Sequence, residues 1–164
     1  MPRVVVLADT HLRAGRPRQL PDAVWAAIAD CHLVLHAGDV VDGSLLDALD
    51  ARQVPYRAVL GNNDLSLRDA LPERLEFEIE GVLVAMVHDS GATKGRPARL
   101  KRWFPDAQVV VFGHSHAPYN EWHDGQLLFN PGSATERRQQ PVRTFGVIEL
   151  DAGRVTSSEI KPLE

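Results

Sequence analysis

Hydrophobic residues in the first part of the chain form short continuous runs, and each run stops at a polar residue. Residues 4–8, 32–37 and 55–60 are such runs, which are typical of strands buried on both faces of a sheet. Between them, residues 21–29 and 44–52 place their apolar positions at helical spacing. The order strand, helix, strand, helix, strand predicts a parallel sheet with right-handed crossovers.

The remainder of the chain has the pattern of hairpins. Alternating or apolar runs flank short turn sequences within residues 75–87, 119–129 and 144–160, and each of these segments predicts a pair of antiparallel strands. Residues 96–104 read as a short basic helix and residues 109–112 as one more buried strand. Parallel strands followed by antiparallel ones predict an α/β fold of four layers, α/β/β/α, in which two mixed β-sheets pack face to face with helices outside.

Length and composition fit one domain over residues 1–164. The chain is 44% hydrophobic and 24% charged, with no internal repeat or linker, which are ordinary values for a folded protein. Its single cysteine, Cys31, excludes an internal disulfide, and no run approaches the roughly 20 apolar residues of a membrane span. We therefore expect a cytoplasmic protein without a membrane partner.

The charge balance narrows the range of partners. A formal charge of −4 and a pI of about 6.0 argue against strong nucleic-acid binding, which depends on neutralising many phosphates. A small phosphorylated substrate needs only local positive charge and is compatible with this balance. Trp103, Phe104, Tyr119 and Trp122 suit either a core or an interface, so a homo-oligomer stays open.

Polar donor residues follow the predicted strands. Because ligands of open α/β sheets bind beyond the carboxyl ends of the strands, we expect these side chains to meet in one site. Mixed carboxylate, imidazole and amide donors without a thiolate suit Mn²⁺, Fe or Zn²⁺. A carboxylate shared by two cations gives the clamp used in phosphoryl displacement. The predicted donors are Asp9, His11, Asp39, Asn62, His88, His114 and His116.

The order of these motifs resembles that of the calcineurin-like metallophosphoesterase family. The chain reads Asp-x-His, Gly-Asp, Gly-Asn-x-Asp, His and Gly-His-x-His in order from Asp9 to His116, and Asn-Pro-Gly-Ser follows at residues 130–133. The short length and this last motif are similar to the small bacterial and archaeal phosphodiesterase branch. The resemblance implies the four-layer fold and two divalent metal ions, with manganese first and iron, nickel or zinc as alternatives.

The resemblance also assigns roles to residues. It implies that Asp9, His11 and His116 bind the first metal, that Asp39 bridges, and that the second metal is held by Asn62, His88 and His114. The implied activity is that of a phosphodiesterase, which hydrolyses small phosphate esters by in-line attack of metal-bound hydroxide. The alternative is a catalytically weak metal-binding scaffold that acts through protein partners, as a retromer subunit similar to this family does.

One position departs from the family pattern. Many members carry histidine after the motif's asparagine, whereas this chain has Asn63. An amide donates a hydrogen bond but cannot act as a general acid near neutral pH. We therefore expect esters with good leaving groups to be preferred. For Asn63, orientation of the ester and a purely structural role both stay open.

Other polar residues have structural interpretations. His36 lies inside a predicted strand and reads as a satisfied sheet histidine, and Asp64 reads as a residue that holds a ligand loop in place. Residues 130–133 suit either bracing of the site loops or substrate contact. The basic residues of the predicted helix at residues 96–104 read as a solvated face.

Overall fold

The computed structural model describes residues 2–164, which fold into two five-stranded sheets and three α-helices. The first sheet has the order β10-β9-β1-β2-β3. Parallel pairing joins β1 to β2 and β2 to β3, and the hairpin of β9 and β10 is added antiparallel on the other side of β1. Its strands are β1 (Arg3–Leu7), β2 (Leu33–His36), β3 (Tyr56–Ala58), β9 (Thr144–Asp151) and β10 (Arg154–Pro162).

The second sheet has the order β4-β5-β6-β8-β7. Its central strands β5, β6 and β8 are parallel, and β4 and β7 pair antiparallel at the two edges. Each sheet is therefore mixed, as predicted, but the sheets do not correspond to the two halves of the sequence. Its strands are β4 (Arg74–Ile79), β5 (Val82–Val87), β6 (Val109–Val111), β7 (Tyr119–His123) and β8 (Gln126–Asn130).

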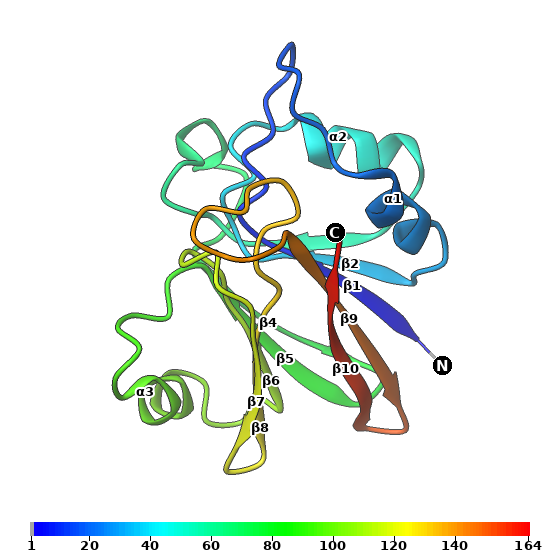
Figure 1. Cartoon of the computed structure of the whole chain (residues 1–164). Coiled ribbons are helices and arrows are strands. Elements are labelled where there is room, and N and C mark those ends of the chain that lie inside the picture. Colours follow the sequence, from blue (N-terminus) through cyan, green and yellow to red (C-terminus); the bar gives the residue numbers. More distant parts are fainter. Residues whose placement is uncertain (1) are drawn as a thin grey trace.

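Helices cover the outer faces of both sheets. Helices α1 (Asp22–Ala29) and α2 (Ser44–Ala51) pack on the first sheet, and α3 (Arg96–Trp103) packs on the second. Figure 1 shows α3 on the opposite side of the molecule from α1 and α2, with the sheets between them. Residues such as Val6 and Phe129 fill the space between the sheets. The predicted α/β/β/α sandwich is confirmed.

The loops that follow β1, β2, β5 and β6 lie together across the junction of the two sheets. The Asp9 N–H donates to the Gly38 carbonyl at 2.9 Å, which joins the loops after β1 and β2. The Gly113 N–H donates to the His88 carbonyl at 3.0 Å, and this bond joins the loops after β5 and β6. A short 3₁₀ turn, η1 (Leu65–Leu67), follows the β3 loop and has no counterpart in the predicted elements.

Candidate metal centre

The structure brings all seven predicted donors together at this junction. Asp9, Asp39, His88 and His116 are buried, His11 is largely buried, and Asn62 and His114 are exposed at the rim. The buried members come from loops after β1, β2, β5 and β6. Convergence of these loops at the strand ends is the arrangement that the sequence pattern predicts; whether each side chain binds metal stays a prediction.

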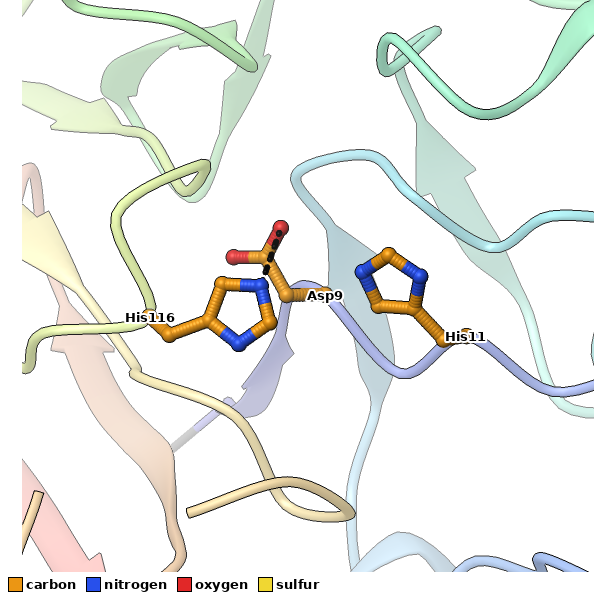
Figure 2. A group of neighbouring side chains, drawn as sticks. All are labelled: Asp9, His11 and His116. Carbon is orange, nitrogen blue, oxygen red and sulfur yellow. Dashed lines mark ion pairs between the residues drawn. The ribbon is translucent and has the colours of Figure 1, made fainter. Parts of the chain in front are cut away.

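The first group of donors is Asp9, His11 and His116. Figure 2 shows the Asp9 carboxylate above the His116 ring, joined to it by the marked ion pair, and the His11 ring on the other side of Asp9. Its Oδ1 atom lies 3.6 Å from His116 Nε2, and the ring centroids of the two histidines are 5.4 Å apart. One potential ligand atom from each of the three residues lies within 4.8 Å of the others, so they could hold a single cation.

The second group is built around His88. Its Nε2 atom lies 2.9 Å from Asn62 Oδ1, and the same oxygen lies 3.3 Å from His114 Nδ1. Asp39 and Asp9 complete this side, with ligand atoms within 4.8 Å of one another and of His88. The three residues that the family resemblance assigns to a second metal are thus neighbours.

Two carboxylates lie between these groups. Asp39 Oδ2 lies 3.4 Å from His11 Nε2 and 3.5 Å from His88 Nε2, so it faces both sides, as a bridging ligand must. Asp9 Oδ1 also faces both, at 3.6 Å from His116 Nε2 and 3.8 Å from His88 Nε2. The family resemblance assigned the bridging role to Asp39 and assigned Asp9 to the first metal only.

Three buried polar atoms at this centre lack a hydrogen-bond partner among residues 2–164. They are Asp9 Oδ1, His11 Nε2 and His116 Nδ1. Buried polar atoms in folded proteins nearly always have a partner, because leaving one without a partner costs about 1–3 kcal/mol. Two of these atoms, Asp9 Oδ1 and His11 Nε2, face the space between the carboxylates and imidazoles. Divalent cations would satisfy them, so the residues fit the predicted metal ions.

The backbone is strained where these side chains leave it. Positive φ values occur at Asp9, His11, Asp39, His114 and His116, between 48° and 73°. This left-handed conformation costs a non-glycine residue on the order of 1–3 kcal/mol and persists only where the surrounding structure enforces it. Five of the seven predicted donors share it. The strain turns side chains from different loops toward one point.

Two glycines, which have no side chain, allow Asp39 and His88 to lie close to the neighbouring backbone. A Cβ atom added at Gly61 would lie 2.3 Å from both the backbone nitrogen and Oδ1 of Asp39. At Gly38 it would lie 2.6 Å from His88 Nδ1. Neither position has room for a larger residue, which explains why glycine precedes Asp39 and Asn62 in the motifs.

Two histidines near the centre have defined proton positions. His88 Nδ1 donates to the Ala37 carbonyl at 2.7 Å, and this leaves Nε2 to face the donors. His36 accepts from the Gly38 N–H through Nδ1 at 3.1 Å and meets Thr10 Oγ1 through Nε2 at 2.9 Å. Burial lowers the pKa of His36 to about 3. His36 is therefore the satisfied sheet histidine that the sequence predicts.

The two central carboxyl groups differ in acidity. Burial raises the pKa of Asp9 to about 7, against the opposing effect of the His88 charge. Burial acts in the same direction on Asp39, but interactions with His11, His88 and the Asn63 N–H outweigh it and hold the pKa of Asp39 below its ordinary value. Burial and Arg138 lower the pKa of His116 to about 4. At neutral pH one carboxylate is thus firmly ionised and the other is close to its titration point.

Asp64 ties two of the site loops together. Its carboxylate accepts N–H donors from Asp39 at 2.9 Å, Val41 at 2.5 Å and Gly61 at 2.8 Å. The loops after β2 and β3 are therefore fixed to one buried side chain. This is the structural role that the sequence predicts for Asp64.

Residues 130–133 brace the remaining loops. Asn130 Nδ2 donates to the Gly113 carbonyl at 3.2 Å, and Ser133 Oγ donates to the Asp9 carbonyl at 2.8 Å. Both bonds hold segments that carry predicted ligands. Of the two interpretations left open for this motif, the hydrogen bonds support bracing.

Asn63 contacts Asp39. Its backbone N–H donates to Asp39 Oδ1 at 2.9 Å, and its side-chain amide donates to Asp39 Oδ2 at 3.0 Å. These bonds orient the carboxylate between the two groups of donors. They give Asn63 a structural role, while contact with the ester stays a prediction.

The sequence analysis missed one acidic residue beside the centre and misjudged a basic one. Glu136 Oε2 lies 3.8 Å from His116 Nδ1, and Glu136 pairs with Arg18 and Arg138. Arg138 is only two residues from Glu136, but Arg18 is 118 residues away, so no local pattern marks this cluster. The expectation of a solvated face was wrong for Arg96, which is buried, bonds Ser90 Oγ and stacks over Phe112.

Comparisons with known proteins agree with this geometry. Residues 3–153 match the family model described as the calcineurin-like phosphoesterase superfamily domain. The chain is 33% identical over 158 residues to a probable metallophosphoesterase of Methanothermobacter thermautotrophicus, an alignment that covers 95% of this chain and 90% of that protein. Within residues 2–164, no helix is long and apolar enough to span a membrane.

Solved structures share the architecture. Vps29 of Entamoeba histolytica, solved in complex with zinc, superimposes with a TM-score of 0.77 at 20% identity over 98% of each chain. A protein described as a novel archaeal phosphodiesterase superimposes with a TM-score of 0.68 at 18% identity, over 96% of this chain and 99% of its own. At these identities the likeness shows the fold alone.

Proposed function

The chain belongs to the calcineurin-like phosphoesterase superfamily, and from that membership we propose that it is a dinuclear metal-dependent phosphodiesterase acting on small phosphate esters. The observation that supports this most directly is the group of buried donor atoms without partners, Asp9 Oδ1 and His11 Nε2 above all. A protein that kept only the fold would have no reason to retain unsatisfied buried polar atoms. A structural neighbour with the same architecture is described as a phosphodiesterase.

The roles proposed for the side chains follow from their positions. Asp9, His11 and His116 would hold one cation, and a second would be held by Asn62, His88 and His114. Asp39 would bridge, because its Oδ2 atom faces His11 and His88 at nearly equal distances. Two bound cations would supply charge for the phosphoryl group and lower the pKa of a shared water. Manganese is the first candidate, with iron, nickel and zinc as alternatives.

The chain's own contribution is to orient its donors before any ligand arrives. His88 keeps its Nδ1 proton on the Ala37 carbonyl, so its Nε2 atom always faces the centre. Asn63 holds both oxygens of Asp39. A histidine in place of Asn63 could transfer a proton to the leaving group, whereas the amide cannot. The proposed enzyme therefore favours esters whose leaving group departs without protonation.

Hydrolysis of two chromogenic esters tests the proposal. Metal-stripped protein is assayed on bis-p-nitrophenyl phosphate and p-nitrophenyl phosphate, with Mn²⁺, Ni²⁺, Zn²⁺ or Mg²⁺ added back in turn. We expect turnover only with metal, and faster turnover of the diester. Activity that persists in fully stripped protein would refute metal dependence, and faster turnover of the monoester would refute the diesterase assignment.

A binding scaffold is the second candidate function. Two observations favour it: the likeness to Vps29 in fold, and an amide at Asn63 where many members have histidine. The scaffold would bind metal without turning over either ester. If elemental analysis found two bound ions and the protein hydrolysed neither ester with any of the four metals, the scaffold function would be supported.

A further inference from the structure

Positive charge is concentrated in the loop between β1 and α1. Residues 12–20 contain Arg13, Arg16 and Arg18 and no acidic residue, and all three arginines are exposed. In Figure 1 this loop, drawn in blue, projects from the top of the molecule. The loop is therefore positively charged, although the whole chain has a formal charge of −4.

The three arginines line a hollow beside the candidate metal centre. Its volume is about 310 Å³, and Pro17 and His11 complete its wall. Because His11 also belongs to the first group of donors, the hollow adjoins the candidate metal centre. A molecule held at the centre can therefore extend into it.

Two of the three guanidinium groups are available for a ligand. Arg18 is paired with Glu136 at 2.5 Å. Arg16 forms no ion pair or side-chain hydrogen bond within the described residues 2–164. Arg13 forms none there either, although its charge lowers the pKa of Asp42. Arg13 and Arg16 therefore face the hollow with unpaired positive charge.

The loop that carries them is held in place. The Ala14 N–H donates to Asp42 Oδ2 at 2.9 Å, and the Arg16 N–H donates to the Arg13 carbonyl at 3.2 Å. At its base Leu12 forms a β-bridge with Val41 in the loop after β2. Binding would therefore cost little ordering of the loop backbone.

The opposite side of the centre has a different charge. A second hollow of about 300 Å³ lies beyond His88 and His114, and Glu73 and Asp89 line it together with Arg74. The Arg74 guanidinium lies 4.2 Å from the centroid of the Trp103 ring. The two carboxylates outnumber the single arginine of this hollow, so an anionic part of a substrate would be attracted more strongly to the arginine loop.

We propose that the hollow beside His11 binds a second phosphate group of the substrate through Arg13 and Arg16. The inference rests on the proposed phosphodiesterase function and names its substrate class: small diesters that carry a further phosphate. Arginine suits this role because its planar guanidinium presents paired N–H donors that match phosphate oxygens.

A pair of chromogenic esters tests the proposal. The substrates are the p-nitrophenyl ester of thymidine 5′-phosphate and the same ester with a 3′-phosphate. We expect the native protein to favour the phosphorylated ester by about tenfold in kcat/KM, since a charge-assisted hydrogen bond contributes on that scale. In the double variant Arg13→Gln/Arg16→Gln this ratio should fall to about one. Arg102→Gln, on α3, is the matched control and should keep the native ratio.

A binding measurement separates this proposal from the proposed activity. Calorimetric titration compares thymidine 3′,5′-bisphosphate with thymidine 5′-monophosphate, neither of which has to turn over. Tighter binding of the bisphosphate that is lost in the double variant supports the arginine site even if neither ester is hydrolysed, in which case only the phosphodiesterase proposal fails. Equal affinity for the two nucleotides, or a preference that the double variant keeps, overturns the arginine site.

Discussion

The loops that carry the predicted metal donors, here called the ligand loops, and the hairpin turns both contain non-glycine residues with positive φ, but for different purposes. In the turns Glu80, Asp124 and Ala152 have φ values of 49–50°, and a glycine with positive φ follows each of them. There the conformation reverses the chain between twisted strands, and the three side chains are exposed. In the ligand loops Asp9 and Asp39 take similar φ values of 54° and 61° but are buried. The comparison shows that strain at a turn serves the chain path, whereas strain at the centre serves the direction of side chains.

The largest contrast is expected from one substitution made in both regions. Asp39→Asn and Asp124→Asn each replace a left-handed aspartate by asparagine, a residue that tolerates this conformation. We expect Asp39→Asn to reduce metal-dependent diester hydrolysis by about 10³-fold, because loss of bridging charge removes several kcal/mol of stabilisation. Asp124→Asn should change it less than about twofold, since surface substitutions usually have small effects.

Circular dichroism and thermal unfolding of both variants provide the control for this contrast. Each variant should retain the native spectrum. Full activity in a folded Asp39→Asn protein would contradict the proposed bridging role.

A smaller contrast is expected from alanine at two glycines. Gly61→Ala places a Cβ atom 2.3 Å from Asp39 Oδ1, whereas nothing lies within 4 Å of a Cβ at Gly125, where φ is +76°. We expect Gly61→Ala to lower the free energy of unfolding by about 1–3 kcal/mol and to weaken metal binding. Gly125→Ala should cost about 1–2 kcal/mol from backbone strain alone.

Urea unfolding and metal titration distinguish the two glycine variants. Only the Gly61 variant should combine lower stability with weaker metal affinity. If metal affinity fell equally in both, the close approach of Gly61 to Asp39 would have no functional role.

Burial of the Asp9 carboxyl group predicts a pH dependence of metal binding. Because burial raises the pKa of Asp9 to about 7, this group carries a proton at lower pH, and a cation must displace that proton. We therefore expect affinity to rise about tenfold per pH unit below pH 7 and to level off above it. Titration of metal-free protein with Zn²⁺ at pH 6, 7 and 8 measures this. Equal affinity at pH 6 and pH 8 would contradict a raised Asp9 pKa.

The smallest effect is expected in a hairpin turn. Ala152 has a φ of 49°, and Ala152→Gly removes this strain at the cost of a more flexible unfolded chain. We expect a net stabilisation of about 0.5 kcal/mol and no change in metal affinity. Thermal unfolding with and without metal checks both, and a change in metal affinity would show that turns and ligand loops are not independent.

The sequence predicted most of the fold, because strand type and helix spacing are local properties. Each predicted strand and helix is present to within a few residues, such as β5 at Val82–Val87. Pairing partners are not local. The hairpin of β9 and β10 joins β1, whose residues are more than 130 positions earlier, through bonds that no short pattern specifies.

The candidate site was predictable to a similar extent. The donor positions follow strand ends, so Asp9, Asp39 and His88 could be named before their neighbours were known. Contacts between distant side chains could not be named. Glu136 contacts Arg18 across 118 positions of sequence, and Arg96 of α3 stacks over Phe112 in the loop after β6.

The location of the candidate metal centre across both sheets would couple metal binding to folding. The His114 N–H donates to Asp9 Oδ2 at 2.9 Å, and this bond joins a loop of the second sheet to a loop of the first. A partly folded chain with only one sheet formed would hold at most four of the seven donors. A metal ion held by these donors would therefore bind the native state and shift the folding equilibrium by mass action, by about 2.7 kcal/mol at a free metal concentration of a hundred times Kd. The supply of the ion in the cell would thus set the amount of folded protein as well as the occupancy of the centre.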